Sequence, residues 1–234
     1  MPMKPVDAHC HIDFERFEDD RDEVVKRARE KLEFIVNAGS NFSNNKDVLQ
    51  LSEIYGDFVR PALGLHPTYT DNFSELEKVK QQVKKHDPVA VGEIGLDHHH
   101  VTEEGLRERQ KEVFRELLSL AEELQKPVVV HSRDAERRAF EVLKEYDLHD
   151  IMLHCFNGTP ELAKKAVKEG MNIGVTTQVL YSNRVQEIVE RIDVENMLLE
   201  TDAPFLYRGE RNEPVNVVES AEKIAEIKDL ELRE

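Results

Sequence analysis

Short apolar runs alternate along the chain with longer segments rich in Glu, Lys and Leu at helical spacing. This rhythm occurs about eight times. The apolar runs predict strands that end near His9, Ala38, Leu65, Ile94, His131, His154, Val175 and Glu200. The amphipathic segments predict helices over residues 21–31, 46–55, 74–86, 104–125, 135–146, 160–169 and 183–191. Such strand–helix repeats indicate βαβ units and a parallel sheet.

Eight repeated units favour a closed (β/α)8 TIM barrel of the α/β class. Several predicted strands are almost entirely apolar, for example Pro127-Val128-Val129-Val130. This composition suits strands that are covered on both faces. An open doubly wound sheet is the second interpretation, because the same alternation permits it. No low-complexity tract or linker divides the sequence, so we expect a single domain over residues 1–234.

The net charge restricts the ways in which this chain could bind nucleic acid. Lys and Arg number 32 and Asp and Glu number 48, giving a formal charge of −16. This balance argues against a protein that coats a duplex with cationic side chains. A nuclease can nevertheless hold phosphate with bound cations and a few arginines at one cleft. The acidity therefore lowers the expected non-specific affinity without excluding a nucleic-acid substrate.

Cysteine usage and hydropathy indicate the compartment. The two cysteines are too few for a secreted disulfide framework, and the start Met1-Pro2-Met3-Lys4 lacks the apolar run of a signal peptide. No stretch approaches the roughly 20 apolar residues that cross a bilayer. We expect a cytoplasmic protein without a membrane span and without an obligate protein partner.

Candidate ligands for metal ions follow five of the eight apolar runs. In a (β/α)8 barrel the carboxyl ends of the strands converge on one mouth. The segments at these ends are Asp7-Ala8-His9-Cys10-His11, Gly92-Glu93-Ile94-Gly95-Leu96-Asp97, His131-Ser132-Arg133, His154-Cys155-Phe156 and Glu200-Thr201-Asp202. Four histidines and two carboxylates would therefore meet in one cavity. A single histidine at a strand end is usually an ordinary hydrogen-bonded residue, but the joint pattern predicts a metal centre.

The spacing of these residues indicates two ions rather than one. Strand alternation puts His9 and His11 on one side and turns Cys10 the other way. Six ligands exceed the needs of one open site, so we expect two divalent ions roughly 3.5–4 Å apart, with Glu93 as the shared carboxylate. Cys155 also alternates with its neighbouring ligand, so we expect both cysteines to face the barrel wall as inert thiols.

Other catalytic motifs are missing from the sequence. It contains no Gly-x-Ser-x-Gly elbow, no phosphate loop and no strand-linked Gly-x-Gly-x-x-Gly. These omissions argue against a serine nucleophile and against nucleotide kinase chemistry. Hydrolysis by a water that two ions activate remains the best interpretation.

The chain resembles the TatD family of metal-dependent deoxyribonucleases over essentially its whole length. The resemblance rests on the five segments above, extended to Asn157-Gly158 and Ala203-Pro204, together with Leu63-Gly64-Leu65-His66-Pro67 and Arg211-Asn212-Glu213-Pro214. It implies an amidohydrolase-type TIM barrel that hydrolyses DNA, often as an exonuclease. Family members usually continue through one more helix after the segment matching 221–230. The chain is therefore either a short member or a truncated one.

The resemblance also implies roles for individual residues. One ion would lie among His9, His11, Glu93 and Asp202, and the other among Glu93, His131 and His154. Asp202, Glu93 and His66 would be catalytic, and Asp202 stands where it can accept a proton from the attacking water. His66 would contact the substrate phosphate, and Arg133 and Arg211 would contact its charge. An arginine paired with Glu213 is an equally good account of Arg211.

Metal identity and reaction class stay open at this point. Four imidazoles suit Zn, Mn, Co or Fe better than Mg, although the family is commonly described as magnesium-dependent. The same centre could hydrolyse an ester or amide, as a D-aminoacyl-tRNA deacylase does. A metal-storing or scaffold protein is a third hypothesis, which open coordination positions argue against. The run His98-His99-His100 stands where the family more often has aromatic residues. It could supplement the metal site, stack on a base or form a solvated loop.

Overall fold

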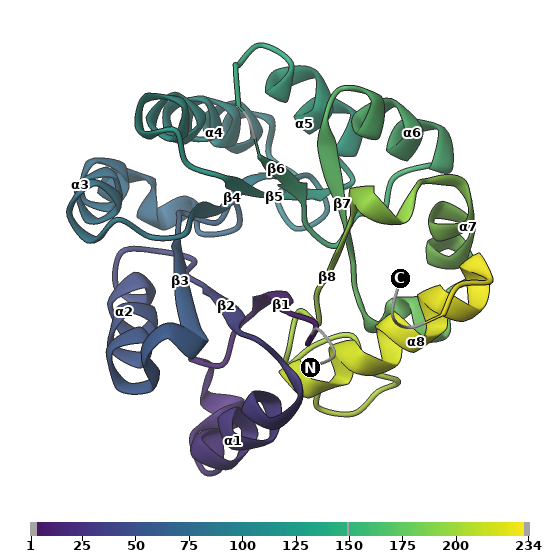
Figure 1. Ribbon diagram of the computed structural model, residues 1–234. Coiled ribbons are helices and arrows are strands. Elements are labelled where there is room, and N and C mark those ends of the chain that lie inside the picture. Colours follow the sequence, from purple (N-terminus) through teal and green to yellow (C-terminus); the bar gives the residue numbers. More distant parts are fainter. Residues whose placement is uncertain (1–3, 149, 232–234) are drawn as a thin grey trace.

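Eight parallel strands pair in chain order in a computed structural model that describes residues 4–148 and 150–231. The strands are β1 (Asp7–Cys10), β2 (Ile35–Ala38), β3 (Val59–Leu63), β4 (Ala90–Asp97), β5 (Val128–Arg133), β6 (Ile151–Leu153), β7 (Met171–Val175) and β8 (Met197–Leu199). Helices surround the strands in a ring (Figure 1). The fold is the predicted TIM barrel, and the open doubly wound sheet is wrong.

Backbone hydrogen bonds join the first strand to the segment that follows the last one. The Asp202 amide donates to the His9 carbonyl over 2.9 Å, and the His11 amide donates to the Ala203 carbonyl over 2.7 Å. These bonds lie at the carboxyl ends of β1 and β8, so they close the barrel where the predicted ligands stand.

The first seven α-helices of the described residues lie close to their predicted positions, whereas no helix was predicted over α8 (Val217–Lys228). The first seven are α1 (Arg21–Lys31), α2 (Asn44–Tyr55), α3 (Leu76–His86), α4 (Glu104–Leu124), α5 (Glu136–Leu143), α6 (Pro160–Lys168) and α7 (Asn183–Arg191). The predicted segment 74–86 is too long, because a 3-10 helix over Thr70–Glu75 precedes α3. The segment 135–146 is also too long, because α5 ends at Leu143. None of the helices in the described ranges is long and apolar enough to cross a membrane.

Strand β5 shows how the alternation of side chains positions the site. Val128 and Val130 belong to the large cluster between the strands and the outer helices. Val129 instead belongs to a small cluster to which β2, β3, β4 and β6 each contribute, which places it inside the barrel. With a period of two, His131 and Arg133 share the face of Val129. The carboxyl end of β5 therefore presents polar side chains to the mouth above an apolar interior.

The buried side chain of Asp7 stabilises the closure of the barrel. Asp7 is fully buried, and its oxygens accept hydrogen bonds from the Thr201 amide (2.9 Å), the Thr201 hydroxyl (2.5 Å) and the His9 amide (3.3 Å). Asp7→Ala leaves these buried donors without a partner, and we expect the free energy of unfolding to fall by about 3 kcal/mol. Denaturant titration measures this change. Asp7→Asn keeps one acceptor oxygen and should lose less, whereas an unchanged value in Asp7→Ala would contradict the assignment.

Candidate metal centre

The carboxyl ends of the strands surround a cavity of about 520 Å³. Five of the six predicted metal ligands line it, namely His11, Glu93, His131, His154 and Asp202, and His66, Asp97, His100 and Arg133 line it as well. His9 is fully buried and makes close contacts with this lining. The structure thus brings together all six residues that the sequence indicated.

The first group of donor atoms comes from β1, β4 and the segment after β8. The Nε2 atoms of His9 and His11 lie 3.1 Å apart. Glu93 Oε2 lies 3.5 Å and 3.7 Å from these two nitrogens. Asp202 Oδ1 lies 3.8 Å and 3.6 Å from the same pair. His9, His11 and Glu93 thus offer three donor atoms within reach of one ion, and Asp202 Oδ1 borders the two histidines of this group.

The second group gathers around the other oxygen of Glu93. Glu93 Oε1 lies 2.9 Å from His131 Nδ1, 3.3 Å from His66 Nε2 and 3.6 Å from His154 Nε2. The two carboxylate oxygens of Glu93 therefore face different groups of imidazoles. This is the arrangement that a shared ligand of two ions requires.

Carboxylates and a backbone carbonyl hold the outer nitrogens of three of the histidines. His11 Nδ1 lies 2.9 Å from the Ala38 carbonyl, His154 Nδ1 lies 2.5 Å from Glu200 Oε2, and His131 Nε2 lies 3.0 Å from Asp97 Oδ2. Such contacts set the tautomer and the ring orientation of metal-binding histidines. His9 differs, because its buried Nδ1 has no hydrogen-bond partner among the described residues.

Glu200 and Asp97 are functional candidates to which the sequence gave no role. Both stand in the segments at the strand ends, and both carboxylates are fully buried. Their signal in the sequence, an acid after an apolar run, is the same as that of Glu93. Only the three-dimensional arrangement shows that they contact the outer side of a histidine rather than the centre of the cavity.

Three of the histidines are held in the neutral form that binds metal. Burial lowers the pKa of His9, of His11 to about 4 and of His154 to about 4. His131 behaves differently: burial lowers its pKa, but the hydrogen bonds with Asp97 and Glu93 outweigh this effect and raise it to about 9. An ion beside Glu93 would compete with the proton on His131 Nδ1, because metal binding requires the unprotonated nitrogen.

The carboxylates of the site repel one another, which a bound cation would relieve. Burial raises the pKa of Asp202 well above its usual range, and the nearby charges of Glu93 and Glu200 raise it further. Burial also acts to raise the pKa of Glu93, but attraction to His66 and His154 and a hydrogen bond from His131 bring it well below its usual value. The donor set and its charge therefore fit divalent ions.

His66 lies closer to the second group than the sequence indicated. The structure places His66, Glu93 and His131 within reach of a single ion. However, the Thr68 amide donates to His66 Nδ1 over 3.3 Å, and the Thr68 hydroxyl lies 2.7 Å from the same atom. A neutral His66 that accepts at Nδ1 carries its proton on Nε2. The Nε2–H group is then a donor that faces the cavity, which favours a substrate contact over a metal bond.

The two predicted arginines have different surroundings. Arg133 is exposed, lines the cavity and forms no ion pair within the ranges that the structure describes. The guanidinium of Arg211 instead donates to Asp20 over 2.6 and 2.7 Å and to Glu213 over 3.0 Å. The contacts of Arg211 are thus those of the ion-pair alternative.

The two cysteines and the three consecutive histidines can also be compared with their predicted positions. Cys10 is buried, and its thiol donates to the Val36 carbonyl, as expected for an inert thiol in the wall. The strand argument was wrong for Cys155, because β6 ends at Leu153 and Cys155 lies in a left-handed conformation with φ of 44°. In the run of histidines, His100 lines the mouth and contacts Asp97 Oδ2 over 2.9 Å.

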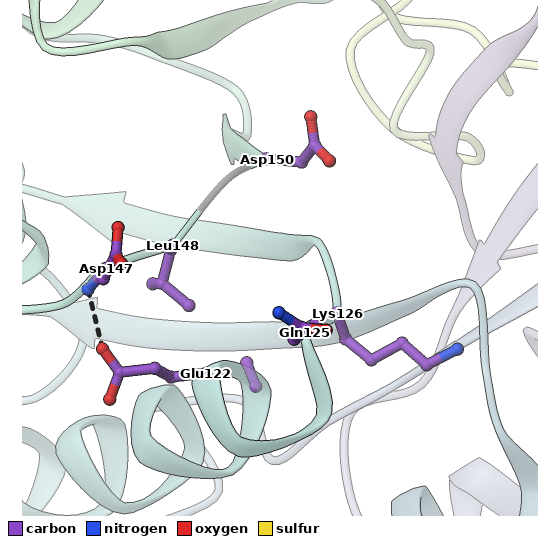
Figure 2. A pocket seen from close by; sticks show the side chains of 7 residues that line it. Glu122, Gln125, Lys126, Asp147, Leu148 and Asp150 are labelled. Carbon is purple, nitrogen blue, oxygen red and sulfur yellow. Dashed lines mark hydrogen bonds between the residues drawn. The ribbon is translucent and has the colours of Figure 1, made fainter.

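A separate hollow lies at the opposite end of the barrel. Glu122, Gln125 and Lys126 at the end of α4 line it together with Asp147 and Asp150, which precede β6 (Figure 2). The Asp147 amide donates to Glu122 Oε1 over 2.7 Å. Among the described residues that line it, this hollow has neither the histidines nor the convergent donor groups of the mouth, so the described catalytic candidates lie at the mouth.

Comparisons with known proteins find relatives over almost the whole chain. The model of the family described as TatD related DNase matches residues 6–234. An uncharacterized metal-dependent hydrolase of Methanocaldococcus jannaschii is 41% identical, with 99% of this chain and 92% of that protein covered. The human deoxyribonuclease TATDN3 is 31% identical, with 98% and 89% covered. The crystal structure of the TatD homolog YJJV from Escherichia coli K12 superposes with a TM-score of 0.86 at 29% identity, with 99% and 93% covered.

Proposed function

The chain belongs to the TatD family of metal-dependent hydrolases, and from this premise we propose that it hydrolyses phosphodiester bonds in DNA, removing nucleotides from a strand end. The observation that carries the proposal is the position of Glu93, whose two oxygens face two separate groups of histidines. The name of the human relative, a deoxyribonuclease, supports the choice of substrate.

Two divalent ions are part of the proposal. His9, His11, Glu93 and Asp202 would hold one ion, and Glu93, His131 and His154 would hold the other. Bound ions supply Lewis-acid stabilisation of the charge that develops on the phosphoryl oxygens and acidify the attacking water. The imidazole-rich donor set favours Zn, Mn or Co for tight binding, and added Mg would support turnover.

The side chains of the chain carry out the remaining steps. Asp202 accepts the proton of the attacking water, because its carboxylate borders both donor groups and reaches the cavity. The Nε2–H group of His66 donates a hydrogen bond to a phosphoryl oxygen. Arg133 at the rim attracts the anionic strand, since an arginine without an ion pair offers its whole guanidinium to a phosphate.

The ion count is the first prediction for this centre. Protein reconstituted with metal and then desalted should contain about two divalent ions per chain, as measured by elemental analysis beside an activity assay. Removal of the ions with a chelator should abolish turnover, and their return should restore it. A fully active preparation with one ion per chain would remove the shared role of Glu93.

A second prediction concerns His66. His66→Ala should keep both ions and lose about 10²-fold in turnover, because the variant lacks the Nε2–H donor while the ligands stay in place. Metal analysis and steady-state kinetics on the same sample separate the two effects. Thr68→Val, which removes the hydroxyl beside His66 Nδ1, is a milder control. Loss of an ion from His66→Ala would make His66 a ligand.

A substrate panel tests the proposed function itself. Metal-reconstituted protein is given end-labelled single-stranded DNA, duplex DNA, RNA and transfer RNA charged with a D-amino acid. We expect stepwise release of nucleotides from DNA. Release of free amino acid with a specificity constant orders of magnitude above that of nucleotide release would instead support the deacylase alternative.

A further inference from the structure

A second cavity, of about 420 Å³, lies outside the metal centre between α4 and α5. We name it the α4–α5 groove. Its lining includes Lys111, Arg137, Arg138, His98 and Glu108. Arg137 and Arg138 are exposed on the first turn of α5, directly downstream of the strand that ends in Arg133.

The groove carries an excess of positive charge although the chain as a whole is acidic. Two further cations in its wall are balanced: Arg115 pairs with Glu145 over 2.7 Å, and Arg107 lies 3.9 Å from Glu104. Lys111, Arg137 and Arg138 form no ion pair with any described residue.

The carboxylates of the groove wall do not cancel this excess. Glu141 pairs with Lys144 over 2.6 Å, which leaves Glu108 as the one wall carboxylate without an ion pair among the described residues. Three uncompensated cations against one carboxylate make a local site for anions within a chain of net charge −16.

The loop of three histidines connects the groove to the mouth. His100 lines the mouth cavity, and His98 lines the groove. The His98 amide donates to the Arg133 carbonyl over 2.9 Å, and Arg138 Nη1 lies 3.4 Å from His98 Nδ1. These contacts place the groove, with Arg137 and Arg138, directly beside the segment that carries Arg133 at the rim of the mouth.

Two arginines of the groove wall lie near enough to His98 to affect its pKa. Burial lowers the pKa of His98, and the charges of Arg107 and Arg138 lower it further. The nearby carboxylates of Glu104 and Asp97 act in the opposite direction and do not reverse the shift. Burial is the largest of these causes, so the excess of cations rests on the ion pairs and not on this pKa.

We propose that the α4–α5 groove binds the phosphates of a nucleic-acid strand whose end lies in the metal centre. This inference rests on the proposed function. A nucleic-acid strand carries one negative charge per nucleotide, so its successive phosphates can each contact a different guanidinium group. A guanidinium group binds phosphate through paired hydrogen bonds. The groove adds affinity for long strands, and a substrate of one nucleotide does not reach it.

Two substrates of different length test the groove in the metal-loaded protein. One is single-stranded DNA of about twelve nucleotides, and the other is the short diester thymidine 5′-(4-nitrophenyl) phosphate. The double variant Arg137→Ala/Arg138→Ala should lose about tenfold in kcat/KM for the long strand, with a shallower dependence on salt because two phosphate contacts are gone. Its kcat/KM for the short diester should stay within about twofold of the starting value.

The double variant Lys165→Ala/Lys168→Ala is the matched control. Both lysines are exposed on α6, and neither forms an ion pair with a described residue, so the change in net charge is the same. The control should cleave both substrates normally. Arg137→Lys/Arg138→Lys should recover part of the activity on the long strand.

The possible outcomes separate the groove from the proposed function. Equal losses on both substrates, or equal losses in the control, would overturn the groove assignment while DNA cleavage by the starting protein stands. If the starting protein cleaves neither substrate, the proposed function fails. Fluorescence anisotropy with the labelled long strand then tests whether the groove binds nucleic acid. Weaker binding by the arginine variant than by the lysine control supports the groove assignment. Equal binding by both variants overturns it.

Discussion

Glu93→Gln should remove at least one of the two ions from the chain and lower kcat by at least about 10³-fold, which corresponds to about 4 kcal/mol of transition-state stabilisation. The amide has nearly the same shape as the carboxylate, but it lacks the negative charge. It also has a single oxygen, whereas Glu93 offers Oε2 to His9 and His11 and Oε1 to His131 and His154. One of the two donor groups would therefore meet an NH₂ group, which cannot bind a cation.

Metal content and turnover have to be measured on the same samples of this variant. Glu200→Gln is an informative control, because Glu200 contacts only the outer nitrogen of His154 among the ligands and the Cys155 amide. Loss of such an outer contact typically weakens metal affinity by about 10- to 100-fold, so this control should be rescued by added metal. A Glu93→Gln variant that kept both ions would contradict the shared-ligand assignment.

Much of the fold could be predicted because the barrel repeats one simple rule. Most strands are short, largely apolar runs that an amphipathic helix follows, and α1 and α7 were located to the residue. The errors occurred where the rule changes locally. The residues before α3 form a 3-10 helix, whose hydrophobic spacing differs little from that of an α-helix over six residues.

Much of the site could be predicted for a similar reason. The prediction failed at residues that lie beyond the end of a strand. His131 and Arg133 follow the alternation of β5, so their direction was correct from the sequence. Cys155 lies beyond the end of β6 in a left-handed turn, where a period of two no longer applies. The contacts of Arg211 with Asp20 join residues far apart in the sequence, and no local pattern could indicate them.

Asp97 and Glu200 show a further limit of predicting the role of a residue from its position at the end of a strand. An acid that follows an apolar run can bind an ion or can hold a histidine that does so, and the two cases have the same sequence pattern. Their partners separate them. Asp97 contacts His131 Nε2 and Glu200 contacts His154 Nδ1, the ring nitrogens on the far side from Glu93. Asp202 Oδ1 instead lies near the Nε2 atoms of His9, His11 and His154.

Asp202→Asn should lower kcat by about 10³-fold while most of the bound metal stays, because the amide can no longer accept a proton. Asp202 Oδ1 lies 3.6–3.8 Å from the Nε2 atoms of His9, His11 and His154. These imidazoles and Glu93 would still hold the ions, so the effect should fall on kcat rather than on metal content. Circular dichroism and elemental analysis check the fold and the ions.

The pH dependence of Asp202→Asn gives the sharper test. Burial and the charges of Glu93 and Glu200 raise the pKa of Asp202 without metal, and a cation held beside it would favour the ionised form. A proton acceptor works only when it is ionised, so activity of the metal-loaded protein should fall as the pH drops through the pKa of Asp202. In the Asp202→Asn variant, this fall of activity at low pH should disappear from the pH profile. Near-normal turnover of Asp202→Asn with both ions bound, or an unchanged acid limb, would show that another group accepts the proton.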